Sequence, residues 1–282
     1  MQGQGVVDLD HPKYYNGGKG ILERVMAEAK DPKRYAHLKD SEGKWVVRDD
    51  VFVRYRTKAE EVKTGGLSIG FTGYGGKHHI GPELQIGHRL GDFYEEPVLL
   101  IKTAWGGKSL YKDFRPPGAD GETGPFYKQM MEEIQEGLAQ IKTEFPDLAD
   151  HKPVITGFFW LQGWNDMGEE DARAEYADNL VQLASDVRVN LKIPSLPFVI
   201  GELGNGGPEA GESMMKIREA QKRAAELIEP KGSAFFVQTS QFARPKEESP
   251  NVSHGHHWFG NAESYFLIGD ALGEAMVKLL SR

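Results

Sequence analysis

The stretch Val98-Leu99-Leu100-Ile101-Lys102-Thr103-Ala104-Trp105-Gly106-Gly107-Lys108-Ser109 joins a short apolar run to a glycine turn. A run of this length, rich in branched side chains, is typical of a strand buried on both faces of a sheet. The paired glycines after it indicate a tight turn. We therefore predict a strand over residues 98–104 whose carboxyl end leads into a loop.

Three further apolar runs repeat this pattern. They predict strands over residues 154–161, 197–201 and 234–239. Between and after the strands lie segments whose apolar residues recur every three or four positions, which is the period of an amphipathic helix. These segments predict helices over residues 125–141, 176–187, 211–228 and 262–280.

Strands that alternate with helices of this length indicate βαβ units. The predicted fold is an α/β, three-layer α/β/α sandwich with a mostly parallel, flavodoxin-like sheet, formed by residues 1–282 as a single domain. Residues 19–60 have a different pattern and are expected to be an insertion. Within it we predict a surface helix over residues 21–30 and a hairpin in which residues 44–48 pair with residues 51–55.

Composition narrows the possible functions. The 282 residues are 39% hydrophobic, carry a formal net charge of −8 and include no cysteine. The missing cysteine excludes disulfides, thiolate metal ligands and a cysteine nucleophile. No block rich in lysine and arginine indicates a nucleic-acid partner. No apolar run reaches the roughly 20 residues needed to span a bilayer, so no membrane partner is expected. The oligomeric state stays open.

Ligands of an open α/β sheet bind at the carboxyl ends of its strands. Glycines, amides and histidines collect in the segments expected there. After the second predicted strand comes Gln162-Gly163-Trp164-Asn165-Asp166, and after the third comes Glu202-Leu203-Gly204-Asn205. Ser253-His254-Gly255-His256-His257-Trp258 precedes the last helix. These segments are the candidate site.

Four blocks of the chain resemble a known group of enzymes. The group includes sialate O-acetylesterases and family-six acetylxylan esterases, within the SGNH hydrolase superfamily. The blocks are Gly81-Pro82-Glu83-Leu84, Trp105-Gly106-Gly107-Lys108-Ser109-Leu110, Trp160-Leu161-Gln162-Gly163-Trp164-Asn165-Asp166 and His257-Trp258-Phe259-Gly260-Asn261-Ala262-Glu263. Their order and spacing make the resemblance fairly specific.

The resemblance implies a carbohydrate O-acetylesterase, a serine hydrolase that needs neither a metal nor an organic cofactor. Its partner would be an acetylated carbohydrate. His257 is the implied general base, because imidazole titrates near neutral pH. The backbone N–H of Gly107 and the amide of Gln162 are the implied donors to the oxyanion.

The sugar and the orientation of the base involve further residues. Trp105, Trp164, Trp258 and Asn165 are predicted to contact the substrate. The superfamily often orients its histidine with an aspartate three residues earlier, but here that position is His254. Asp166, Glu248 or a backbone carbonyl could orient His257 instead, and the sequence leaves this choice open.

The nucleophile is the main departure from the family pattern. The family's serine lies in Gly-Gln-Ser-Asn-Met, and Met1 resembles the methionine of that motif. We therefore expect the serine and the first strand to lie upstream of Met1, and the chain as printed to be nearly inactive. The first residues lack the charged start and apolar stretch of a signal peptide. A longer natural protein would be secreted or periplasmic.

Two other interpretations compete with the esterase. Trp164 stands where the family has a glutamate, which fits a carbohydrate-binding protein that kept the fold and lost catalysis. His254, His256 and His257, together with the His78-His79 pair, could instead bind a metal, although the spacing of known metal motifs is absent.

One serine near the glycine turn could be mistaken for a nucleophile. Ser109 lies outside a Gly-x-Ser-x-Gly elbow. We interpret its hydroxyl as structural.

Overall fold

The computed structural model describes residues 2–8 and 16–282. They form two compact units. The first unit comprises the described residues up to Ala104, with residues 205–207 and 242–273. The second unit comprises residues 105–204, 208–241 and 274–282. Each unit is described by itself.

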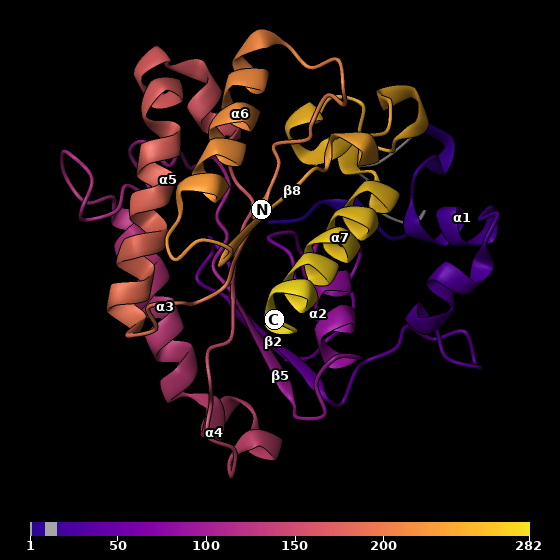
Figure 1. Cartoon of the computed structure of the whole chain (residues 1–282). Helices are drawn as coiled ribbons and strands as arrows, with labels where there is room; N and C mark the ends of the chain where they lie inside the picture. The colour runs from indigo at the N-terminus through magenta and orange to yellow at the C-terminus, as the bar shows by residue number, and fades with distance from the viewer. Residues whose placement is uncertain (1, 9–15) are drawn as a thin grey trace. The chain divides into compact units, whose positions relative to one another are not determined.

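The sheet of the first unit is built around strand β2 (Val51–Arg56). It pairs in parallel with β5 (Val98–Lys102) and antiparallel with β3 (Val62–Gly66). Val53 lies opposite Leu100 on one side and Gly65 on the other. Helix α2 (Glu83–Gly91) packs against β2 and β5 (Figure 1). The parallel β2–β5 pair gives this unit its α/β character.

The predicted hairpin between residues 44–48 and 51–55 is wrong. Residues 51–55 are buried and pair with β3 and β5, whereas Trp45 forms only an isolated bridge with Lys39. The physical reason is burial. The side chains of residues 51–55 are buried between two partner strands, whereas none of residues 44–48 is buried and Val47 is 60% exposed.

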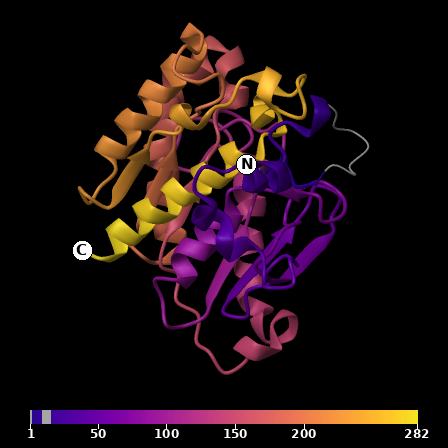
Figure 2. The same cartoon turned by 90° about the vertical axis from the view of Figure 1, so that its right-hand side faces the viewer.

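The sheet of the second unit is fully parallel. β7 (Phe198–Gly201) lies between β6 (Phe158–Trp160) and β8 (Ala234–Val237). Helices α5 (Glu170–Leu191) and α6 (Glu212–Leu227) lie side by side (Figures 1 and 2). The predicted α/β class with mostly parallel pairing is therefore confirmed.

The remaining elements are short, apart from two helices. Helix α3 (Pro125–Ala139) begins at its proline, as predicted, and α7 (Ala262–Leu280) has the predicted bounds. The others are β1 (Gly5–Val6), β4 (His79–Ile80), α1 (Leu22–Ala27), α4 (Ile141–Glu144), η1 (Asn16–Gly18), η2 (Pro32–Leu38), η3 (Pro146–Leu148), η4 (Trp164–Gly168), η5 (Ser240–Phe242), η6 (Lys246–Glu248) and η7 (Gly255–Gly260). In the part of the chain that the structure describes, no helix has the length and apolarity to cross a bilayer.

The four predicted strands are confirmed, though each is shorter than expected. The largest difference is at residues 154–161, where the strand begins only at Phe158 and Val154 is 76% exposed. The expectation of a further strand upstream of Met1 stays a prediction, as does the single domain with an insertion.

Candidate active site

A glycine turn follows β5 in the chain. Gly107 lies in the left-handed region, with φ 76°, and no atom outside its chain neighbours stands within 4 Å of where a Cβ would be. Among the described residues, nothing accepts a hydrogen bond from the N–H of Gly106 or Gly107. Gly107 is exposed. The turn can therefore offer backbone donors to a ligand. The predicted role of Gly107 in an oxyanion site stays a prediction.

Asp166 anchors the loop over residues 108–111, which follows this turn. Its carboxylate is fully buried and accepts the backbone N–H of Leu110 at 3.0 Å and of Tyr111 at 2.9 Å. The side-chain amide of Gln162 donates to it at 2.6 Å. Burial raises the pKa of Asp166, and these donors oppose the rise. Asp166 thus fixes the loop over residues 108–111.

The amide of Gln162 is itself engaged within the second unit. Its Nε2 donates to the Lys108 carbonyl at 2.9 Å and to Asp166 at 2.6 Å. Its Oε1 accepts from the Tyr176 hydroxyl at 3.1 Å. Both amide hydrogens therefore have protein partners here, and Gln162 supports the loop before any ligand arrives. Its predicted role as an oxyanion donor stays a prediction.

The hydroxyl of Ser109 serves the same loop. It donates to Asp113 at 3.0 Å and accepts the backbone N–H of Lys112 at 3.1 Å. The Ser109 N–H also donates to Asp113. These contacts support the interpretation that Ser109 is structural.

The predicted sugar-binding residues differ in exposure. Trp105 and Trp258 are only 6% and 2% exposed, and Trp105 packs against Phe114 and Phe126. Trp164 is 38% exposed, and Asn165 beside it is exposed. The substrate contacts stay predictions, and Trp164 presents the accessible aromatic surface among the three tryptophans.

His257 belongs to the first unit, in helix η7. Its ring centroid lies 4.4 Å from that of His256 and 6.2 Å from those of His254 and Tyr74. Its Nδ1 is buried and has no hydrogen-bond partner within residues 2–8 and 16–282. Burial and the two neighbouring histidines lower the pKa of His257 to about 3. The imidazole is therefore neutral at pH 7, as a proton acceptor must be, but it is only weakly basic.

The backbone beside His257 is unusual. Trp258 and Phe259 both have φ of 53°, in the left-handed region that bulky side chains rarely adopt, and Gly260 follows at 69°. Such outliers persist only where the surroundings impose them, and they concentrate at functional sites. Here the Tyr265 hydroxyl donates to the His257 carbonyl at 3.2 Å.

A buried network in the first unit was not predicted from the sequence. Glu83 and Lys102 form an ion pair of 2.8 Å with side chains only 8% and 9% exposed. Lys63 donates to three backbone carbonyls nearby. Glu83 lies in the Gly-Pro-Glu block, but nothing in the sequence indicated its partner 19 residues later.

The histidine cluster is the alternative candidate for a metal site. His254, His256 and His257 lie with ring centroids 4.4 to 6.2 Å apart. Over the described ranges, however, no three histidine, aspartate or glutamate side chains are arranged to hold a metal ion.

Comparison with known proteins identifies the family. Residues 1–278 match the family described as carbohydrate esterase, sialic acid-specific acetylesterase. The chain belongs to this carbohydrate esterase family. No curated protein is significantly similar in sequence.

Solved structures share the fold of this carbohydrate esterase. A protein of Arabidopsis thaliana superposes with a TM-score of 0.55 at 16% identity, over 85% of this chain and 90% of that one. A carbohydrate acetylesterase from Xanthomonas citri also gives 0.55 at 16% identity, over 81% of this chain and 49% of that one. At this identity the likeness supports the esterase fold alone.

Proposed function

We propose that this protein removes acetyl groups from the hydroxyls of a carbohydrate. Membership of the carbohydrate esterase family gives the reaction class, and the left-handed turn at Gly107 carries the proposal structurally. Its open backbone N–H groups suit an oxyanion, and one such donor is worth about 3 kcal/mol in the barrier of an acyl transfer. Asp166 and Gln162 keep the following loop in place.

The chemistry follows that of a serine hydrolase. A serine hydroxyl attacks the acetyl carbonyl while His257 accepts its proton, and the carbonyl oxygen becomes an oxyanion held by donors such as the Gly107 N–H. The proton then passes from His257 to the sugar oxygen, which leaves. Water, deprotonated by His257, releases acetate and restores the serine. The family resemblance assigns the serine to a Gly-Gln-Ser-Asn motif ahead of Met1.

Hydrolysis of p-nitrophenyl acetate and of an acetylated sugar tests this proposal. The chain as printed is compared with a chain extended upstream by the motif and its strand. We expect hydrolysis from the extended chain, a much lower rate from the printed chain, and a loss of roughly 10²- to 10⁴-fold for His257→Ala. His151→Ala, which changes an exposed histidine, is the control. Turnover that survives His257→Ala would contradict the proposal.

Two observations favour a second candidate, a carbohydrate-binding protein without catalysis. Both amide hydrogens of Gln162 already have protein acceptors, and the position three residues before His257 is a histidine. Binding of a sugar by the extended chain, measured by calorimetry, without any hydrolysis would select this candidate.

A further inference from the structure

The loop over residues 70–74 should be mobile by composition. Gly70 and Gly73 flank Phe71 and Thr72, and Gly70 has φ of 103°, a conformation that favours glycine. Glycine loses more backbone freedom on folding than any other residue, so such a loop needs external restraint to hold one conformation.

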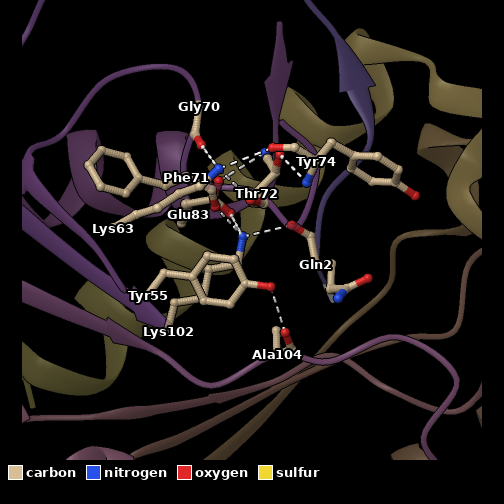
Figure 3. A network of polar contacts seen from close by, with 11 residues as sticks. Gln2, Tyr55, Lys63, Gly70, Phe71, Thr72, Tyr74, Glu83, Lys102 and Ala104 are labelled. Carbon is tan, nitrogen blue, oxygen red and sulfur yellow. Dashed lines mark hydrogen bonds and ion pairs between the residues drawn. The ribbon is translucent and has the colours of Figure 1, made fainter. Parts of the chain in front are cut away.

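Two lysine side chains supply that restraint. The Lys63 ammonium donates to the carbonyls of Gly70, Thr72 and Tyr74 at 3.1, 2.9 and 3.0 Å, as Figure 3 shows. The Lys102 ammonium donates to the Phe71 carbonyl at 2.7 Å. Four of the five carbonyls of this loop therefore bind a cation, and hydrogen bonds to charged donors are stronger than those between neutral groups.

Lys102 is anchored in turn. It donates to the Gln2 carbonyl at 2.9 Å and to Glu83 at 2.8 Å (Figure 3). Glu83 also accepts the Gly81 N–H at 3.0 Å. All three ammonium hydrogens of Lys102 have acceptors, as a buried charge requires. The pair thus ties the loop to the start of α2.

The restrained loop places Tyr74 beside the histidines of η7. The Tyr74 hydroxyl accepts a hydrogen bond of 2.7 Å from Gln4, whose amide also lies 3.0 Å from Nδ1 of His254. The Tyr74 ring meets His257 nearly edge-on, with centroids 6.2 Å apart and planes at 82°. Its centroid also lies 4.8 Å from that of the His79 ring. Edge-to-face contact is a favoured geometry for aromatic rings and constrains their orientation.

We propose that Tyr74, held in place by Lys63 and Lys102, is a positioning residue that orients the imidazole of His257 and shields it from water. The inference rests on the proposed function for its catalytic meaning, because only a reacting histidine needs this orientation. His254 and His256 also make ring contacts with His257, and His254 is connected to Tyr74 through the amide of Gln4.

Titration of the histidine rings by NMR tests the proposal on the chain as printed. In the unaltered protein, burial keeps the pKa of His257 near 3, so its ring signals should stay constant between pH 8 and 5. In Tyr74→Leu and in Lys63→Met we expect His257 to titrate within this range, which means that its ring becomes at least a hundredfold more readily protonated. Tyr74→Phe keeps the ring and should behave as the unaltered protein does.

The matched control is Lys58→Met, an exposed lysine in the turn between β2 and β3. It should leave the His257 signals unchanged. The proposal is overturned if Tyr74→Leu folds and its His257 still does not titrate above pH 5. A lower melting temperature of that variant would not rescue the proposal, because a loss of stability alone shows only a structural role. If Lys63→Met does not fold, Tyr74→Leu decides alone. If the extended chain is inactive but the His257 titrations of these variants are as expected, the proposed function is refuted and the positioning role of Tyr74 stands.

Discussion

At the scale of single residues, the candidate site depends on groups whose role is to hold others. Asp166 accepts hydrogen bonds from two backbone N–H groups and from one side-chain amide. Its carboxylate therefore stabilises the loop that follows Gly107. Buried acceptors of this kind are costly to remove, because their donors are then left unpaired.

Asp166→Asn replaces one acceptor oxygen by an NH₂ group. In one orientation the new NH₂ donor faces the N–H donors of Leu110 and Tyr111, and in the other it faces the amide donor of Gln162. We expect the unfolding free energy to fall by about 1–3 kcal/mol in urea denaturation, together with slower ester hydrolysis. Asp150→Asn, at an exposed position, is the control; equal stability of the two variants would show that the carboxylate does not hold the loop.

His254→Asp restores a carboxylate three residues before His257. The ring centroids of His254 and His257 lie 6.2 Å apart, and a negative charge at position 254 favours the protonated imidazole. We therefore expect the pKa of His257 to rise from about 3 by roughly one to three units. A base titrating closer to neutral pH should also hydrolyse ester faster at pH 7. NMR titration and kinetics on the extended chain measure both effects. His254→Asn changes size without charge, and a matching pKa rise in that variant would rule out the electrostatic explanation.

At the scale of elements, glycines decide how turns and helices meet. The turn at Gly107 needs glycine because its φ of 76° lies in the left-handed region. Steric contact is not the reason, because no neighbouring atom stands where a Cβ would lie. Gly43, in the first unit, has nearly the same φ, 78°, and also no neighbouring atom. The two positions therefore form a matched pair.

Gly107→Ala and Gly43→Ala should each lower the unfolding free energy by about 1–2 kcal/mol, because alanine resists the left-handed region. Only Gly107→Ala should also slow ester hydrolysis by the extended chain, since only that turn is proposed to bind the oxyanion. Denaturation and initial rates on both variants provide the comparison. Equal activities would remove Gly107 from the proposed site.

Helix α7 approaches the start of α2 through a glycine. A Cβ on Gly269 would lie 2.3 Å from the Pro82 carbonyl oxygen, a backbone atom that cannot move freely. In an open helix, alanine would stabilise relative to glycine by about 0.5–1 kcal/mol. Gly269→Ala should instead destabilise, by about 1–3 kcal/mol for an overpacked core position. The control is Gly168→Ala, where no atom lies within 4 Å, and a stabilising Gly269→Ala would contradict the close approach.

At the scale of the whole molecule, histidines with lowered pKa values link folding to pH. Burial lowers the pKa of His257 to about 3 and that of His88 to about 4, and it also lowers the pKa values of His37 and His256. The folded protein therefore binds fewer protons than the unfolded chain, whose histidines titrate near 6.5. By linkage, the unfolding free energy is highest above pH 6.5 and falls as the pH drops towards 4.

Urea denaturation at pH 7.5, 5.5 and 4.5 should show this loss, with about 1.4 kcal/mol for each pH unit while buried His88 stays neutral. The exposed His37 and His256 contribute less, because solvent screens them. Asp166, whose pKa is raised, opposes the trend only at the acidic end. His88→Gln should flatten the slope, because His88 is only 4% exposed. A slope unchanged in that variant would show that His88 protonates freely in the folded protein.

The extent to which sequence predicted structure differs between the elements. The period of apolar residues located α3, α6 and α7 closely, because a helix satisfies its hydrogen bonds within itself. The parallel strands were located too, but not the partner of residues 51–56, because strand pairing joins segments more than 40 residues apart. Lys63 and Lys102 look like ordinary charged residues in the sequence, and only the hydrogen bonds and the ion pair of the folded chain show what they bind.

The sequence by itself determined the α/β class, the helices and the candidate blocks around Gly107, Gln162 and His257, because local periodicity and short motifs are properties of neighbouring residues. Only the tertiary structure decided that the Gln162 amide is already bonded, that Trp105 and Trp258 are buried, and that the loop over residues 70–74 is held by lysines. Those features depend on which distant groups meet in the folded chain, and the choice among many possible partners is made by packing.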